Sequence, residues 1–155
     1  MDDGELLATL LRQVREARVA GRTREAILLG ICEVLHRARV EYDWVGFYLA
    51  DGTKPELVLG PYVGAVTDHT RIPFGRGICG QVAESRATMV VPDVAAVANY
   101  LSCSLDVKSE IVVPILVDGR FVAQLDIDSH QRNRFSPTDR LLLENLAKAL
   151  APLFA

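Results

Sequence analysis

The chain has 155 residues, a formal net charge of −3 and a hydrophobic content of 50%, which fits a single domain over residues 1–155 with one core. The sequence contains no run of Lys and Arg, so neither nucleic acid nor an anionic membrane surface is expected as a partner. No apolar run approaches the roughly 20 residues of a membrane-spanning helix, and the N-terminus M-D-D-G-E is not a signal peptide. We therefore expect a cytoplasmic protein.

The cysteines indicate thiols that stay reduced. There are three of them in the chain, and an odd number without a secretory signal argues against a disulfide framework. No C-x-x-C motif or Cys/His cluster is present, so no metal site is expected.

Apolar residues at helical spacing predict two N-terminal helices, over about residues 5–18 and 23–38. Cys32 lies on the apolar stripe of the second helix. We expect it to be a small buried hydrophobic residue without a redox role.

A β-hairpin is predicted next from W-V-G-F-Y-L at residues 44–49, a D-G turn, and E-L-V-L-G-P-Y-V. Strand alternation places Trp44 and Tyr48 on one face. Two interpretations of these aromatic residues stay open, the core or the lining of a pocket.

The segment G-R-G-I-C-G at residues 75–80 matches G-x-G-x-x-G, but no β-α-β unit surrounds it to support a dinucleotide site. The glycines instead predict a tight turn into a helix over about residues 78–85. Cys79 would lie in the first turn, where the helix dipole favours a reactive thiolate. A buried structural cysteine is the alternative.

A short strand at residues 88–91 is followed by an irregular run over residues 92–108. Loops of this length are often functional. Cys103 lies between two serines in this run, so we expect an accessible, reactive thiol. Accidental placement is the alternative.

Glu110 precedes the apolar strand I-V-V-P-I-L-V, and a D-G turn joins it to R-F-V-A-Q-L-D-I-D-S. Alternation in the last strand predicts one face with Phe121, Ala123, Leu125 and Ile127, and the other with Val122, Gln124, Asp126 and Asp128. Two carboxylates two positions apart repel each other, so we expect them either to bind an amino group or to face water.

A final helix is predicted over about residues 136–153, with Ser136 as its N-cap and Pro137 at its first position. Its apolar stripe is expected either to pack on the first two helices or to form a homodimer contact. Helices flanking an antiparallel sheet, with one long loop, give an α+β fold.

Five motifs between residue 44 and the C-terminus resemble the GAF-domain free methionine-(R)-sulfoxide reductases: W-V-G-F-Y-L, G-R-G-I-C-G-Q-V-A, V-V-P-D-V, S-E-I-V-V-P-I and L-D-I-D-S. The resemblance implies a GAF-like sheet flanked by N-terminal and C-terminal helices. It also implies reduction of free L-methionine-(R)-sulfoxide with a thioredoxin-like reductant, without a metal or organic cofactor.

The resemblance further implies a role for each matching residue. Cys103 would attack the sulfoxide, and Cys79 would resolve the resulting sulfenic acid as an intramolecular disulfide. Glu110, as an acid with a raised pKa, would assist loss of the sulfoxide oxygen. The implied substrate-binding residues are Trp44, Tyr48, Glu110, Asp126 and Asp128.

The sequence departs from the family pattern at two places. His69 stands where family members often have a further cysteine, and the segment around Cys103 reads N-Y-L-S-C-S in place of G-H-I-A-C-D.

Two other functions stay open: a non-catalytic GAF module that senses a small molecule, and a redox sensor that forms a Cys79–Cys103 disulfide without substrate.

Overall fold

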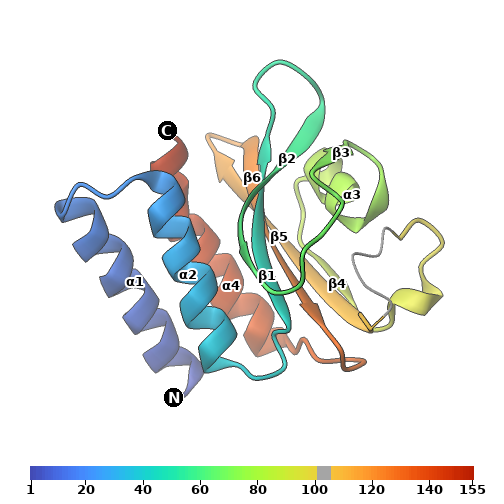
Figure 1. Cartoon of the computed structure of the whole chain (residues 1–155), viewed down its shortest axis with the longest axis horizontal. Helices are drawn as coiled ribbons and strands as arrows, with labels where there is room; N and C mark the ends of the chain where they lie inside the picture. Colours follow the sequence, from blue (N-terminus) through green and yellow to red (C-terminus); the bar gives the residue numbers. More distant parts are fainter. Residues whose placement is uncertain (101–105) are drawn as a thin grey trace.

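The computed structural model describes residues 1–100 and 106–155, which form a six-stranded antiparallel sheet with helices on both faces (Figure 1). Three helices cover one face, namely α1 (Asp3–Val19), α2 (Arg24–Ala38) and α4 (Pro137–Leu150). The helix α3 (Gly77–Ser85) lies on the other face. The strands follow the order β3 (Arg71–Pro73), β2 (Glu56–Val63), β1 (Trp44–Ala50), β6 (Arg120–Ser129), β5 (Ser109–Val117) and β4 (Met89–Val91).

This architecture confirms the predicted α+β fold and both predicted hairpins, β1 with β2 and β5 with β6. Two short 3-10 helices complete it, η1 (Val94–Ala96) and η2 (Ala151–Phe154). Among the described residues, no helix has the length and apolar character needed to cross a bilayer.

The helices begin where side chains satisfy free backbone N–H groups. Asp2 and Glu5 form a capping box at α1, and the Thr23 hydroxyl accepts the Ala26 N–H at 3.1 Å. The predicted cap of the last helix is confirmed, because the Ser136 hydroxyl accepts the Asp139 N–H at 3.2 Å. This helix ends at Leu150, earlier than predicted, and its apolar stripe packs on α1 and β5 within the chain. The homodimer stays a prediction.

Strand alternation divides the apolar residues between two cores, one on each face of the sheet. The larger core lies between the sheet and helices α1, α2 and α4, and contains Phe47 and Cys32. The smaller core lies under α3 and contains Trp44 and Tyr48, whose rings stack with centroids 6.3 Å apart. The prediction that Trp44 and Tyr48 share a face is therefore confirmed.

One predicted side-chain direction is wrong. Phe121 was expected beside Ala123 and Leu125, yet it lies in the core under α3, where its ring meets Phe74 edge-on at 5.8 Å. The cause is a register shift, since Ile115 pairs with Ala123 whereas Leu116 pairs with Phe121. Val122 is the extra residue of a β-bulge, and a bulge reverses the alternation beyond it.

The glycine-rich turn before α3 fits the backbone conformation that it adopts. Gly75 and Gly77 have φ of 91° and 67°, which favour glycine. Gly80 is constrained by space, because a Cβ there would lie 2.6 Å from the Pro73 carbonyl oxygen and 2.9 Å from the Gly75 nitrogen. The turn and the first turn of α3 are thus packed backbone to backbone, which fixes the position of Cys79.

The substitution Gly80→Ala tests this packing. Its methyl group would overlap backbone atoms that cannot rotate away, so we expect the free energy of unfolding to fall by about 1–3 kcal/mol. Gly52→Ala is the matched control, because no atom lies within 4 Å of a Cβ at that position, and we expect a change within about 0.5 kcal/mol. Denaturant unfolding measures both, and equal midpoints would contradict the proposed close packing.

Candidate active site

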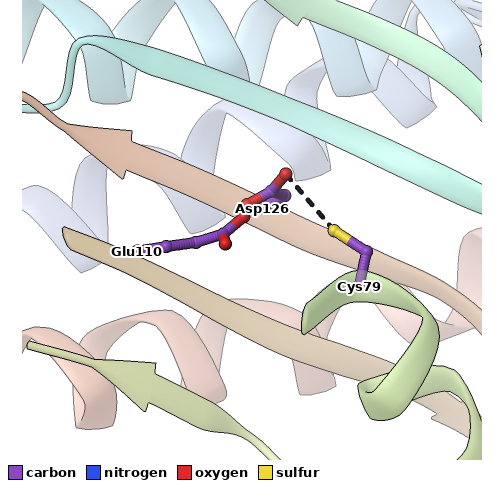
Figure 2. A group of neighbouring side chains, drawn as sticks. All are labelled: Cys79, Glu110 and Asp126. Carbon is purple, nitrogen blue, oxygen red and sulfur yellow. Dashed lines mark hydrogen bonds between the residues drawn. The ribbon is translucent and has the colours of Figure 1, made fainter. Parts of the chain in front are cut away.

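The strands β5 and β6 and the helix α3 bring a thiol and three carboxyl groups together. Glu110 on β5 pairs across the sheet with Asp128 on β6, and Asp126 lies two residues before Asp128 on the same face. Cys79 enters from α3 above them, and its Sγ donates a hydrogen bond to Asp126 Oδ2 at 3.4 Å (Figure 2). One potential ligand atom from each of Cys79, Glu110 and Asp126 lies within 4.8 Å of the other two.

The carboxyl groups are almost fully buried. The exposed fractions are 4% for Glu110 and 1% for both Asp126 and Asp128. Of the two interpretations that the sequence left open for the aspartates, exposure to water is therefore wrong. Buried carboxyl groups this close together cannot all be ionised at an ordinary cost, so protons must remain among them.

The pKa of Glu110 is raised well above its ordinary value, first by burial and then by the charges of Asp126 and Asp128. Burial also raises the pKa of Asp126, while hydrogen bonds from Glu110 and Cys79 oppose this effect. These directions assign the shared proton to Glu110, with the aspartates as acceptors. Glu110 is thus a protonated acid in a buried site, and its part in catalysis stays a prediction.

The expectation of a thiolate at Cys79 is wrong for this structure. Burial raises the pKa of the Cys79 thiol, and the charges of Asp126 and Asp128 raise it further. The predicted position of Cys79 in the first turn of α3 is confirmed. The dipole of a short helix, however, changes the thiol pKa less than desolvation beside carboxylates does. Cys79 is therefore a neutral thiol that acts as a hydrogen-bond donor.

A cavity of about 10 Å³ adjoins the cluster, with Tyr48, Cys79, Glu110 and Asp126 in its lining. The Tyr48 hydroxyl donates to the His69 carbonyl oxygen at 2.9 Å, and His69 also lines the cavity. Trp44 lies behind this wall, stacked on Tyr48, with its Nε1 donating to the Ala65 carbonyl oxygen at 3.0 Å.

A larger cleft of about 480 Å³ lies elsewhere, between Thr88 and Glu144. Neither a cysteine nor a buried acid is among its lining residues in the described structure. The small cavity is therefore the candidate site.

Asn99 is a functional candidate that the sequence reasoning missed. Its side-chain Oδ1 accepts the Gly77 N–H at 3.0 Å, and its Nδ2 donates to the Gly75 carbonyl oxygen at 3.0 Å. These two hydrogen bonds connect the start of the long loop to the turn that leads into α3 and Cys79. Its only sequence signal was its place in the motif around Cys103. Cys103 itself lies outside the described residues.

The structure also bears on two other predictions, the buried position of Cys32 and the absence of a metal site. Cys32 is fully buried in the larger core, far from the carboxyl cluster in the fold, with its Sγ directed to the Pro61 carbonyl oxygen at 3.7 Å. The sequence argument against a metal considered residues close along the chain, whereas Cys79, Glu110 and Asp126 come from three separate elements.

Residues 23–152 match the GAF domain. The chain belongs to the GAF-domain family. This confirms the fold that the sequence motifs implied, and the match spans the sheet together with α2, α3 and α4.

Some relatives within this family are named free methionine-R-sulfoxide reductase. The chain is 35% identical to a protein of Escherichia coli named free methionine-R-sulfoxide reductase, covering 97% of this chain and 92% of that one. It is also similar to the solved structure of free methionine-R-sulfoxide reductase from Neisseria meningitidis in complex with its substrate. The TM-score is 0.88 and the sequence identity is 43%, and the match covers 99% of this chain and 91% of that one. GAF domain-containing protein A of Dictyostelium discoideum is 36% identical over 94% and 90% of the chains.

The raised pKa of Glu110 predicts a pH-dependent stability. The folded state keeps a proton that the unfolded chain releases near pH 4.5. This contribution to stability is complete below that pH and is lost as pH rises towards the folded-state pKa. Glu110→Gln removes the titration, so the free energy of unfolding of wild type should fall relative to this variant by up to about 1.4 kcal/mol per pH unit.

Denaturant unfolding at several pH values between about 5 and 8 measures this difference. Glu16→Gln, at an exposed position on α1, is the matched control for removing one carboxyl group. Parallel pH profiles for wild type and Glu110→Gln would show that Glu110 is ionised in the folded protein.

Proposed function

We propose that this protein reduces free methionine-(R)-sulfoxide to methionine. The observation that supports the proposal is the buried acid Glu110. A carboxyl oxygen of Glu110, a carboxyl oxygen of Asp126 and the Cys79 sulfur all lie within 4.8 Å of one another. The chain is also similar to a reductase whose structure was solved with its substrate. A sulfoxide needs a proton donor at its oxygen and a thiol at its sulfur. The cluster supplies the donor in a site from which water is excluded.

In the first step, the Cys103 thiolate attacks the sulfoxide sulfur. The oxygen takes a proton from Glu110, and the sulfur–oxygen bond breaks as that oxygen passes to Cys103. The products are methionine and a Cys103 sulfenic acid, so methionine sulfoxide gains the two electrons that the thiol loses. Glu110 regains its proton from solvent, because the Cys103 thiolate brings none to the step.

Asp126 and Asp128 have the charge needed to bind the substrate ammonium group. Tyr48 lines the cavity and offers an aromatic surface to the methyl and methylene groups of the substrate, and Trp44, stacked on Tyr48, would contact them once the lining residues move apart. The cavity of about 10 Å³ has room for one water molecule, so binding of an amino acid requires its lining residues to move apart.

In the second step, the Cys79 thiol condenses with the sulfenic acid, which releases water and forms a Cys79–Cys103 disulfide. Cys79 must lose its proton, and Asp126 Oδ2, the hydrogen-bond acceptor at 3.4 Å, is placed to receive it. A dithiol reductant of the thioredoxin type then opens the disulfide by exchange. The cycle uses no metal or organic cofactor and requires a reducing compartment such as the cytoplasm.

A non-catalytic GAF module that binds a small metabolite is the second candidate. It is favoured by the environment of Cys79, because a buried thiol beside carboxylates is a weak nucleophile. Calorimetric binding of an amino acid or its sulfoxide, without consumption of sulfoxide under reducing conditions, would support this function instead.

Substitution of the cysteines tests the reductase cycle. We expect Cys103→Ser to abolish reduction of the R epimer, because it lacks the nucleophile, and Cys79→Ser to complete about one turnover without recycling. A thioredoxin-coupled assay of NADPH oxidation, run separately with the R and S epimers, measures turnover, and mass spectrometry counts methionine formed per chain. Cys32→Ser is the matched control, since this thiol lies in the other core. Full activity of Cys103→Ser would refute the assigned nucleophile.

The acid role of Glu110 makes a separate prediction. Glu110→Gln keeps the side-chain shape but cannot transfer a proton, so we expect kcat to fall by about 10²–10⁴-fold. Wild-type kcat should decline as pH rises through the raised pKa of Glu110, and the residual rate of the variant should lack this decline. Glu16→Gln again serves as control. A Glu110→Gln enzyme with wild-type kcat and pH profile would exclude general acid catalysis by this residue.

A further inference from the structure

We propose that Cys79, Glu110 and Asp126 together bind a thiophilic divalent cation of the Zn²⁺ class. The proposal stands on the arrangement of the three side chains, the size of the cavity beside them, and an unpaired carboxylate oxygen in the cluster. A consequence that does rest on the proposed function is that the cation would compete with the sulfoxide substrate for the same carboxyl groups.

The three ligand atoms are close to the spacing of a zinc site. Zinc bonds to sulfur and oxygen at about 2.0–2.3 Å, so ligand atoms in a tetrahedral site lie about 3.3–3.8 Å apart. The Cys79 Sγ and Asp126 Oδ2 atoms already have this separation, at 3.4 Å. All three ligand atoms lie within 4.8 Å of one another, so a movement of Glu110 by about 1 Å completes the geometry. Figure 2 shows the Glu110 carboxyl group directed towards Asp126.

The surroundings favour a single cation. The adjoining cavity of about 10 Å³ matches one atom of the size of a water oxygen. Asp126 is 1% exposed, and its Oδ1 has no hydrogen-bond partner among the residues that the structure describes. Arg76 is the one arginine or lysine among the described residues that line the cavity.

The ligand set selects the chemical class of the ion. One sulfur and two carboxylate oxygens suit Zn²⁺ or Co²⁺, which accept thiolate and four-coordinate geometry. Mg²⁺ and Ca²⁺ require six or more oxygen ligands, which this cluster does not provide. The bound ion replaces the proton of the Cys79 thiol and the proton on Glu110, and both protons pass to solvent. A fourth position stays open for water.

Metal titration of the reduced, chelator-treated protein tests the proposal. Addition of Co²⁺ should produce a sulfur-to-cobalt charge-transfer absorption that saturates at one ion per chain, and competition against a chromophoric chelator gives the Zn²⁺ affinity. Cys79→Ser should lose the absorption, and both Cys79→Ser and Asp126→Asn should bind Zn²⁺ more than about 100-fold less tightly. Mg²⁺ in excess should leave the signal unchanged.

Two matched cysteine variants locate the ligand. Cys32→Ser should retain the absorption and the affinity, because Cys32 lies in the larger core on the other face of the sheet. The proposal assigns the sulfur ligand to Cys79, so we expect Cys103→Ser to retain both as well. Loss of the signal in Cys103→Ser with retention in Cys79→Ser would overturn the proposal, as would absence of binding in wild type. Circular dichroism identifies a variant that fails to fold, and in that case Asp126→Asn and Glu110→Gln decide the outcome. The titration contains no sulfoxide, so its failure and a failure of the reductase assay are distinguishable.

Discussion

Burial of three carboxyl groups on two neighbouring strands is the constraint on which the site depends. Glu110 and Asp128 face each other across β5 and β6, and Asp126 lies beside them. They cannot turn to solvent, because the alternate residues of the same strands, such as Ile111 and Ile127, fill the larger core under α1, α2 and α4. Reversing either strand would bury the acids there and expose those apolar residues, so strand register holds the carboxyl groups in place.

The helix α3 converts this acidic face into an enclosed site. Gly75 and Gly77 allow the chain to turn sharply, and Gly80 allows the first turn of the helix to approach that turn. Asn99 then ties the beginning of the long loop to the same turn through two hydrogen bonds. The thiol of Cys79 is consequently fixed over Asp126, and the loop that leads to Cys103 starts from the edge of the site.

The thiol and the carboxyl groups behave as one unit, because each group changes the proton affinity of the others. Burial, and then the negative charge of the neighbouring aspartates, raises the pKa of both Glu110 and Cys79, so both groups keep their protons. A protonated acid is suited to a sulfoxide oxygen, whereas the negative charge of the aspartates suits a cation. The ammonium group of an amino acid and a divalent metal ion would satisfy the same electrostatic need, and both proposals for this site rest on it.

The sequence by itself determined the helices, both hairpins, the face shared by Trp44 and Tyr48, and the family, because these follow from local periodicity, turn residues and motif order. It did not determine the side of Phe121, since a bulge at Val122 depends on pairing with β5. Only the tertiary structure decided that Cys79 is a neutral thiol. Its helix position predicted a thiolate, but burial in the folded protein and the charges of Asp126 and Asp128, on a strand far away in the sequence, raise its pKa instead. Effects that depend on neighbours across the fold cannot be derived from local pattern, and they set the protonation of the site.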